Sequence, residues 1–252
     1  MPPDSHALEI KVPAVTLGFW VIKILATTLG ETGGDAVSMS LDLGYLVATL
    51  IFLLVFVACV IAQVRARKFH PFLYWATIIC STTVGTTLAD FATRSLGIGY
   101  AGGSALLFAL LLASLFAWYR AAGTVRVASI DNPRSEWFYW VTIMFSQTLG
   151  TALGDWTADT AGLGYLGAAA IFSGMLSITL ALHCFSRASK TALFWAAFVL
   201  TRPLGAVLGD LLDKPIEKGG FAFSRPLASA LLLGAMVLCV MVFPQRAASR
   251  AH

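Results

Sequence analysis

Charged residues are scarce in this sequence, and the short motifs that mark many enzymes are missing from it. Only 12% of the 252 residues are charged and 58% are hydrophobic, whereas a soluble domain has about 25% charged residues. The sequence contains no G-x-S-x-G, no H-E-x-x-H and no nucleotide-binding glycine loop. We therefore expect an integral membrane protein that is not an enzyme.

Cysteine and histidine are also too few and too scattered to suggest a soft-metal or redox site. The four cysteines lie in apolar segments without a C-x-x-C pair, and the four histidines, including His6 and His252, lie in the tails or near loops. A basic patch with interleaved aromatics, which would indicate nucleic-acid binding, is absent as well. We expect no tightly bound cofactor and no nucleic-acid partner.

Eight long apolar stretches make up most of the chain, and most of them reach the ~20 residues that a helix needs to cross a bilayer. They cover residues 14–38, 43–64, 71–95, 100–119, 137–160, 163–186, 190–213 and 224–243. The chain begins with prolines and acids rather than a basic region and a short apolar one, so we expect no cleavable targeting segment.

The positive charges are divided unevenly between the two sides of such an eight-span chain. The side with both termini would carry Lys11, Arg65, Arg67, Lys68, Arg120, Arg126, Arg134, Arg187, Lys190, Arg246 and Arg250, and the other side Arg94, Lys214, Lys218 and Arg225. Because positively charged loops stay in the cytoplasm, we predict that both termini are cytoplasmic.

The chain contains four copies of one sequence unit. The copies begin with "FWVIKILATTLGETGGD", "YWATIICSTTVGTTLAD", "YWVTIMFSQTLGTALGD" and "FWAAFVLTRPLGAVLGD", in which a Gly follows the Trp by ten residues and an Asp follows it by fifteen. A second Gly lies nine residues beyond each Asp, at positions 44, 99, 164 and 219. Each unit is thus a pair of spans, and the first span of each pair carries the polar motif.

This pattern resembles a bacterial family of proteins with four tandem repeats, each of two transmembrane segments with a characteristic tryptophan, known only as uncharacterised membrane-anchored proteins. The resemblance covers nearly the whole chain, although the fourth repeat departs from it with "RPLGAVLGD". It implies the fold unit but no established activity. Together with the charge bias, it leads us to expect a location in the bacterial inner membrane.

Each repeat holds an even number of spans, so the four motif helices are predicted to run in the same direction. At about 1.5 Å per residue, the motif Gly lies near mid-membrane and the Asp in the outer half. We predict one all-α transmembrane domain over residues 1–252, with eight helices in four tandem parallel repeats (14–64, 71–119, 137–186 and 190–243) around a pseudo-symmetric polar centre.

Residues four apart lie on one side of a helix, and this step traces the polar face of each motif helix. The four faces are Lys23, Thr27, Glu31 and Asp35; Ile78, Thr82, Thr86 and Asp90; Ile143, Gln147, Thr151 and Asp155; and Phe198, Arg202, Ala206 and Asp210. These faces carry five carboxylates and two cations. The excess of negative charge requires water, protons or a bound cation, because charge in a membrane interior is costly.

Oxygen ligands favour hard cations such as Mg²⁺, Mn²⁺ or Ca²⁺. Our leading hypothesis is a transporter for a small inorganic cation, expected to be divalent, with protons as the exchanging species. The expected cation ligands are Glu31, Asp35, Asp90, Asp155 and Asp210, with Thr86, Thr151 and Gln147 as secondary ligands and Lys23 and Arg202 as counter-charges. The expected partners are thus the bilayer, a small cation and protons.

Simpler structural roles compete with this interpretation for several residues. Trp20, Trp75, Trp140 and Trp195 are typical of an interfacial belt, with Trp118, Trp137 and Trp156 as further anchors. The motif glycines are expected to let the helices approach closely. Asp159 and Asp213 are either an outer acidic vestibule or solvated loop charges.

Two other functions remain open from the sequence. The intramembrane charges could pair internally in a scaffold or partner subunit that transports nothing, with Lys23 paired to Glu31. Alternatively, the protein could be a proton-coupled transporter of an organic solute or an anion, with Arg202 as the ligand. The oligomeric state is not set by the sequence.

Overall fold

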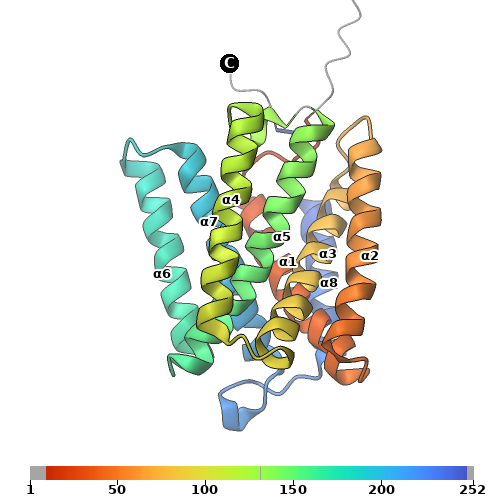
Figure 1. Ribbon diagram of the computed structural model, residues 1–252, viewed down its shortest axis with the longest axis vertical. Coiled ribbons are helices and arrows are strands. Elements are labelled where there is room, and N and C mark those ends of the chain that lie inside the picture. The colour runs from red at the N-terminus through yellow and green to blue at the C-terminus, as the bar shows by residue number, and fades with distance from the viewer. Residues whose placement is uncertain (1–9, 131, 249–252) are drawn as a thin grey trace, which may run out of the picture.

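The structure is a computed structural model that describes residues 10–130 and 132–248. Arg250, His6 and His252 lie outside the described residues. The α-helices are α1 (Leu17–Asp35), α2 (Gly44–Arg65), α3 (Pro71–Asp90), α4 (Tyr100–Ala122), α5 (Pro133–Asp155), α6 (Gly164–Phe185), α7 (Lys190–Asp213) and α8 (Arg225–Val242). Figure 1 shows them as one bundle of upright helices. The eight apolar stretches of the sequence therefore coincide with eight helices of the described chain.

Six of these helices, α2, α3, α4, α6, α7 and α8, are long and apolar enough to cross a membrane. The two others are motif helices with a more polar composition: α1 carries Lys23, Glu31 and Asp35, and α5 contains Gln147 among many hydroxyl residues. The all-helical, membrane-type architecture is thus confirmed, whereas a crossing by all eight helices remains a prediction.

The four motif helices contact one another in a closed order. Helix α1 packs on α3, α3 on α5, α5 on α7, and α7 again on α1. Each of the remaining helices packs on the motif helix of the following repeat, α2 on α3, α4 on α5, α6 on α7 and α8 on α1. The polar motifs therefore lie in the middle of the bundle, and the apolar helices surround them.

The motif glycines are the points of closest approach in this central ring. A Cβ on Gly30 would lie 2.0 Å from the Thr82 side chain, and one on Gly205 would lie 2.1 Å from that of Thr27. The same contact is repeated by Gly85 on Gln147 and by Gly150 on Arg202. Each glycine thus receives the residue three positions before the glycine of the next repeat, which confirms that the motif glycines serve close packing.

The aromatic residues of the motifs pack in the same cyclic order. The ring before each Trp contacts the Trp of the next repeat, with centroid distances of 5.4 Å for Phe19–Trp75, 5.7 Å for Tyr74–Trp140, 6.4 Å for Tyr139–Trp195 and 5.8 Å for Phe194–Trp20. We call these eight residues the aromatic cluster. The hydroxyls of Tyr74 and Tyr139, two members of the cluster, are 2.6 Å apart and share a hydrogen bond.

The interfacial-belt prediction is wrong for most of these tryptophans. Trp75, Trp140 and Trp118 are at most 2% exposed and Trp195 is also buried, because they pack edge to face against neighbouring rings rather than toward lipid. Trp137 and Trp156 are exposed, as expected for surface anchors.

The helix that carries the motif widens into a π-helical turn directly after the motif Asp in three repeats. These turns are η1 (Ala36–Ser40), η2 (Phe91–Ser95) and η4 (Trp156–Thr160), whereas α7 continues through Pro203 to Asp213 and is followed by the 3₁₀ turn η5 (Ile216–Lys218). A π turn inside or at the end of an α-helix frequently accompanies a functional site. The spacing of nine residues between each motif Asp and the second Gly, which recurs in all four repeats, also has a structural cause.

That cause is backbone conformation at the glycines nine residues after each Asp. Gly44, Gly99, Gly164 and Gly219 all have a positive φ, between 63° and 83°. Residues with a Cβ rarely adopt this conformation, so these glycines reverse the chain between the two helices of each repeat.

The two ends of the described chain lie side by side at the end of the bundle with the aromatic cluster. Pro13 and Ala247 form an antiparallel bridge, and Trp75 donates a hydrogen bond to Gln245. Lys11, expected as a cytoplasmic loop charge, is instead 3% exposed and pairs with Glu136 at 2.6 Å. Another short 3₁₀ turn, η3 (Val127–Ser129), lies in the loop before α5.

Substitution of Gly85 by Ala tests the role of the motif glycines. Its Cβ would lie 2.8 Å from a backbone carbon of Gln147, so we expect Gly85→Ala to lower the free energy of unfolding by about 1–3 kcal/mol. In the control Gly174→Ala, the Cβ meets nothing within 4 Å, and no loss is expected. Unfolding of both variants in detergent measures the difference; equal stability would contradict the assigned role.

Candidate functional site

The polar faces of the four motif helices meet at the side chain of Arg202. This guanidinium, from α7, is completely buried. Its Nη2 lies 3.0 Å from Glu31 Oε2 of α1 and 2.7 Å from Thr86 Oγ1 of α3, and it also donates to Thr151 Oγ1 of α5. Arg202 thus contacts polar side chains from the other three motif helices.

The four motif aspartates lie beyond this point, and all of them are buried. Two cations connect them in pairs. Arg94 lies 2.9 Å from Asp90 and 3.5 Å from Asp155, and Lys214 lies 2.8 Å from Asp35 and 3.0 Å from Asp210. Each cation therefore joins the Asp of its own repeat to that of the next repeat.

Arg94, Lys214 and Arg225 were expected as loop charges on the outer side, and their role at the acidic centre is a finding of the structure. Arg225 lies 2.9 Å from Asp213 and 3.7 Å from Asp35. A sequence signal was available for two of the three, because Arg94 and Lys214 each follow a motif Asp by four residues, which favours ion pairing on a helix.

Lys214 lies just beyond the end of α7 and keeps its positive charge in this setting. Burial alone lowers the pKa of Lys214, but the carboxylates of Asp210, Asp35 and Asp213 outweigh this effect and raise its pKa above the ordinary value. Asp35 and Asp210 are therefore paired with a protonated lysine.

We call the buried charged side chains in the middle of the bundle the central column. Its outer part lies at the level of the motif aspartates, its inner part lies nearer the aromatic cluster, and neither part is electrically neutral. The outer part contains five carboxylates (Asp35, Asp90, Asp155, Asp210 and Asp213) and three cations (Arg94, Lys214 and Arg225), which leaves two negative charges if all are ionised. The inner part contains Lys23 and Arg202 with Glu31, which leaves one positive charge. The column is thus acidic toward the π turns and basic toward the aromatic cluster.

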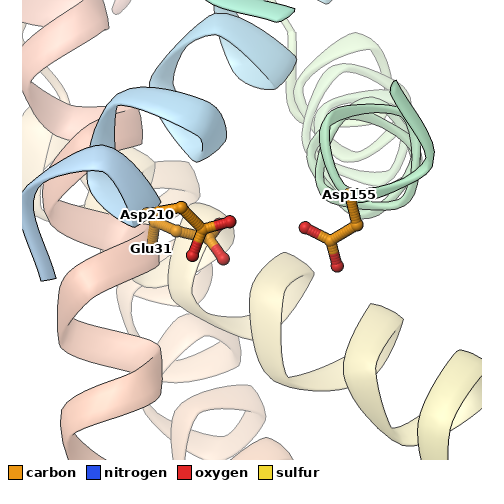
Figure 2. A group of neighbouring side chains, drawn as sticks. All are labelled: Glu31, Asp155 and Asp210. Atoms are coloured by element: carbon orange, nitrogen blue, oxygen red, sulfur yellow. The ribbon is translucent and has the colours of Figure 1, made fainter. Parts of the chain in front are cut away.

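Three of the carboxylates are close enough to share a metal ion. Glu31, Asp155 and Asp210 each offer an oxygen within 4.8 Å of the other two, and all three residues are buried. Figure 2 shows the carboxyl groups of Glu31 and Asp210 together, with that of Asp155 pointing toward them from α5. These three carboxylates come from α1, α5 and α7, so the cluster exists only in the folded bundle.

A second group of three carboxylates, Asp35, Asp210 and Asp213, meets the same distance criterion. Asp35 Oδ1 and Asp213 Oδ1 are buried and accept no hydrogen bond from the described residues. Carboxylate oxygens in that state have capacity left for a cation, a proton or water.

A recess of about 750 Å³ opens at this end of the bundle. Its lining includes Arg94, Lys214 and Arg225, which contact the motif aspartates, together with Tyr100 and Tyr165. Asp159 is exposed and also lines the recess, whereas Asp213 is buried in its ion pair with Arg225. Of the two predicted vestibule residues, only Asp159 thus has access to solvent.

The family model described as "Repeat of Unknown Function (DUF347)" matches the chain four times, at residues 18–69, 73–124, 138–189 and 193–246. The chain belongs to this repeat family. Neither a curated protein nor a solved structure matches it. The four predicted repeats are confirmed, and the DUF347 match supplies no activity.

The DUF347 repeats do not contribute equally to the predicted site. Thr86 donates to Glu31 Oε2 at 3.2 Å and accepts from Arg202, and Thr151 also accepts from Arg202. The structure therefore places both hydroxyls around Arg202 rather than directly on the aspartates. Gln147 is completely buried, and neither polar atom of its side chain has a partner in the described part of the chain.

Of the two predicted counter-charges, Arg202 and Lys23, only Arg202 forms an ion pair within the described residues. Arg202 pairs with Glu31 at 3.0 Å. Lys23, at the equivalent of Phe198 in the fourth DUF347 repeat, has no carboxylate within 4.0 Å among residues 10–130 and 132–248, and its Nζ lies 4.1 Å from the Phe198 ring centroid. A Lys23–Glu31 pair is thus not formed.

Removal of Arg202 tests its role at the meeting point of the four helices. Arg202→Met leaves Glu31 buried without its cation, and we expect a loss of about 3–5 kcal/mol in the free energy of unfolding. The double variant Glu31→Gln/Arg202→Met removes both charges and is expected to recover much of this loss. A double variant that is no more stable than Arg202→Met alone would show that the pair is not the cause.

Proposed function

We propose that this protein is a membrane transporter for a small inorganic cation, with a divalent ion such as Mn²⁺ or Mg²⁺ as the expected substrate. The observation that carries the proposal is the group of Glu31, Asp155 and Asp210, three buried carboxylates with oxygens within 4.8 Å of one another. Ionisable groups inside a membrane protein generally mark ion pathways or proton relays.

The proposed topology has all eight helices crossing the membrane. Helix α1 packs on α3, α7 and α8, and α5 packs on α3, α4 and α7. These neighbours are candidate membrane spans, so the two more polar helices would cross with them and keep their polar side chains away from lipid. The side-by-side position of residues 13 and 247 fits an even number of crossings.

The glycine contacts support a parallel arrangement of the four motif helices around a pseudo-fourfold axis. Gly30 meets Thr82 and Gly34 meets Thr86, so the contact advances by four residues on both helices together. Gly205 meets Thr27 and Gly209 meets Glu31 with the same advance. Antiparallel neighbours would advance in opposite directions.

The charge of the outer part of the column matches a divalent cation. Five carboxylates and three cations leave two negative charges, which one divalent ion would neutralise. Carboxylate oxygens are also the ligands that Mg²⁺, Mn²⁺ and Ca²⁺ prefer. Two protons would neutralise the same charge, which accounts for the proposed proton exchange.

In this proposal Glu31, Asp155 and Asp210 hold the ion, with Asp35 and Asp90 as neighbouring acids. Thr86 and Thr151 position Arg202, and Arg202 holds Glu31. Arg94 and Lys214 would release their aspartates when the cation enters, because a divalent ion supplies the positive charge that they provide without it.

Access would be from the end of the bundle with the recess, which we assign to the outer side of the inner membrane. The opposite end, where the aromatic cluster and the two described chain ends lie, would face the cytoplasm. The cluster would then separate the acidic centre from the cytoplasm, and its opening would complete alternating access.

A second candidate function is a scaffold or partner subunit that transports nothing. One observation favours it: each of the five predicted acidic ligands lies within 4.0 Å of a basic side chain. The two functions differ in one measurable respect, since the scaffold has no need to bind a cation.

Cation binding by the purified protein tests the proposal. We expect Mn²⁺ or Mg²⁺ to raise the midpoint of thermal unfolding, in proportion to the logarithm of ion concentration above the dissociation constant, and vesicles containing the protein to take up the ion. Asp155→Asn should lose both effects, because it removes one of the three clustered carboxylates.

Asp159→Asn is the matched control, since Asp159 lies one turn further along the chain but is exposed to solvent. It should keep the cation response and the uptake. A wild-type protein that responds to no cation, or an Asp155→Asn variant that responds and transports like the wild type, would contradict the proposed function and favour the scaffold.

A further inference from the structure

The inner part of the column, between the aromatic cluster and Glu31, contains hydrogen-bond donors without acceptors. Lys23 is completely buried in α1, and its Nζ has only a 3.5 Å contact to Thr201 Oγ1 and the face of the Phe198 ring. An ammonium group in this position has three donors and lacks an anionic partner in the described structure.

Only one nitrogen of the Arg202 guanidinium makes hydrogen bonds within the described residues. This nitrogen, Nη2, donates to Glu31, Thr82, Thr86 and Thr151. Its Nε and Nη1 are buried and have no partner in residues 10–130 or 132–248. Two sets of donors on a completely buried cation are therefore unused.

Gln147 adds an unused amide at the level of Arg202. In α5 it occupies the position three residues before the motif glycine, which Arg202 occupies in α7. Its side chain is 0% exposed, and its Nε2 is unpartnered within the described residues. Buried polar groups are almost always satisfied in native proteins, so three unsatisfied side chains in adjacent layers call for a common explanation.

We infer that a small inorganic anion, of the size and charge of a halide ion, binds between Lys23, Arg202 and Gln147. Lys23 and Arg202 together with Glu31 leave one positive charge in this part of the column. One monovalent anion would neutralise it and accept from all three donors. Gln147 was expected from the sequence as a secondary cation ligand, and the inference assigns it to the anion instead. The three carboxylates of the proposed cation site are not among the three donors, so the inference does not rest on the proposed cation transport.

The surroundings favour a compact anion over an organic acid or a phosphate. On the side of the aromatic cluster, Lys23 lies over the ring of Phe198, which packs against Phe194 and Trp195 of that cluster. The close contacts of Gly85 with Gln147 and of Gly150 with Arg202 hold the helices together at this level. Water molecules could satisfy the same donors, but they would leave the buried Lys23 ammonium without an anionic partner.

Thermal unfolding of the purified full-length protein, in chloride and in gluconate at constant ionic strength, tests the inference. Gluconate is too large for the site, so we expect chloride to raise the midpoint by about 3–6 °C at ten times its dissociation constant. Bromide should act like chloride. A wild-type midpoint that is the same in chloride, bromide and gluconate would overturn the inference.

Two variants locate the effect. Gln147→Glu supplies a tethered carboxylate at the proposed site, so it should be more stable than the wild type in gluconate and insensitive to chloride. Lys23→Met should also lose the chloride response, whereas Asp159→Asn should keep it. A full chloride response in either Gln147→Glu or Lys23→Met would place the anion elsewhere and overturn the assignment.

The unfolding midpoints of the wild-type protein in chloride, bromide and gluconate test the anion site even if a variant does not fold. This measurement is also independent of the cation experiment. A chloride response without any cation response would remove the proposed function and leave the anion site intact. The reverse result would remove the anion site alone.

Discussion

The buried ion pair between Arg202 and Glu31 is the interaction on which the rest of the centre depends. A guanidinium inside a membrane bundle is stable only with partners for its charge and its donors, and its contacts come from all of the other motif helices. Because those contacts fix the four polar faces toward one point, they also bring the motif aspartates together. The acidic centre is thus a consequence of how the repeats accommodate one cation.

Repetition of the sequence allows this arrangement to be built from short-range rules. In each repeat the same glycine receives a side chain of the next repeat, and the same aromatic ring packs on the next tryptophan. Function would arise where the copies differ. Lys23 and Glu31 occupy positions that carry apolar residues or threonine in the other copies, and Gln147 and Arg202 share one position that is threonine in the first two copies. These four residues distinguish the repeats at the centre of the bundle.

The helices, the repeats and the inward position of the motif residues could be predicted from the sequence, because the Trp, Gly and Asp spacings recur in register. The order in which helices pack could not, since spacing within one chain does not say which outer helix lies on which motif helix. Arg94 and Lys214 were assigned to loops because charge counting treats every basic residue near a span end alike, although their position four residues after an Asp was informative. Burial of Trp75 and Trp140 was missed because the usual membrane preference of tryptophan was applied where aromatic packing between repeats prevails.

The central claim is that Glu31, Asp155 and Asp210 form a cation site within the bundle. The most direct test is anomalous scattering from crystals of the protein grown with Mn²⁺, which locates the metal without reference to activity. The account predicts a peak among these three carboxylates, at about the 2.0–2.2 Å from their oxygens that such metals adopt. Peaks confined to the exposed surface, with Arg94 and Lys214 still paired to the motif aspartates, would contradict it.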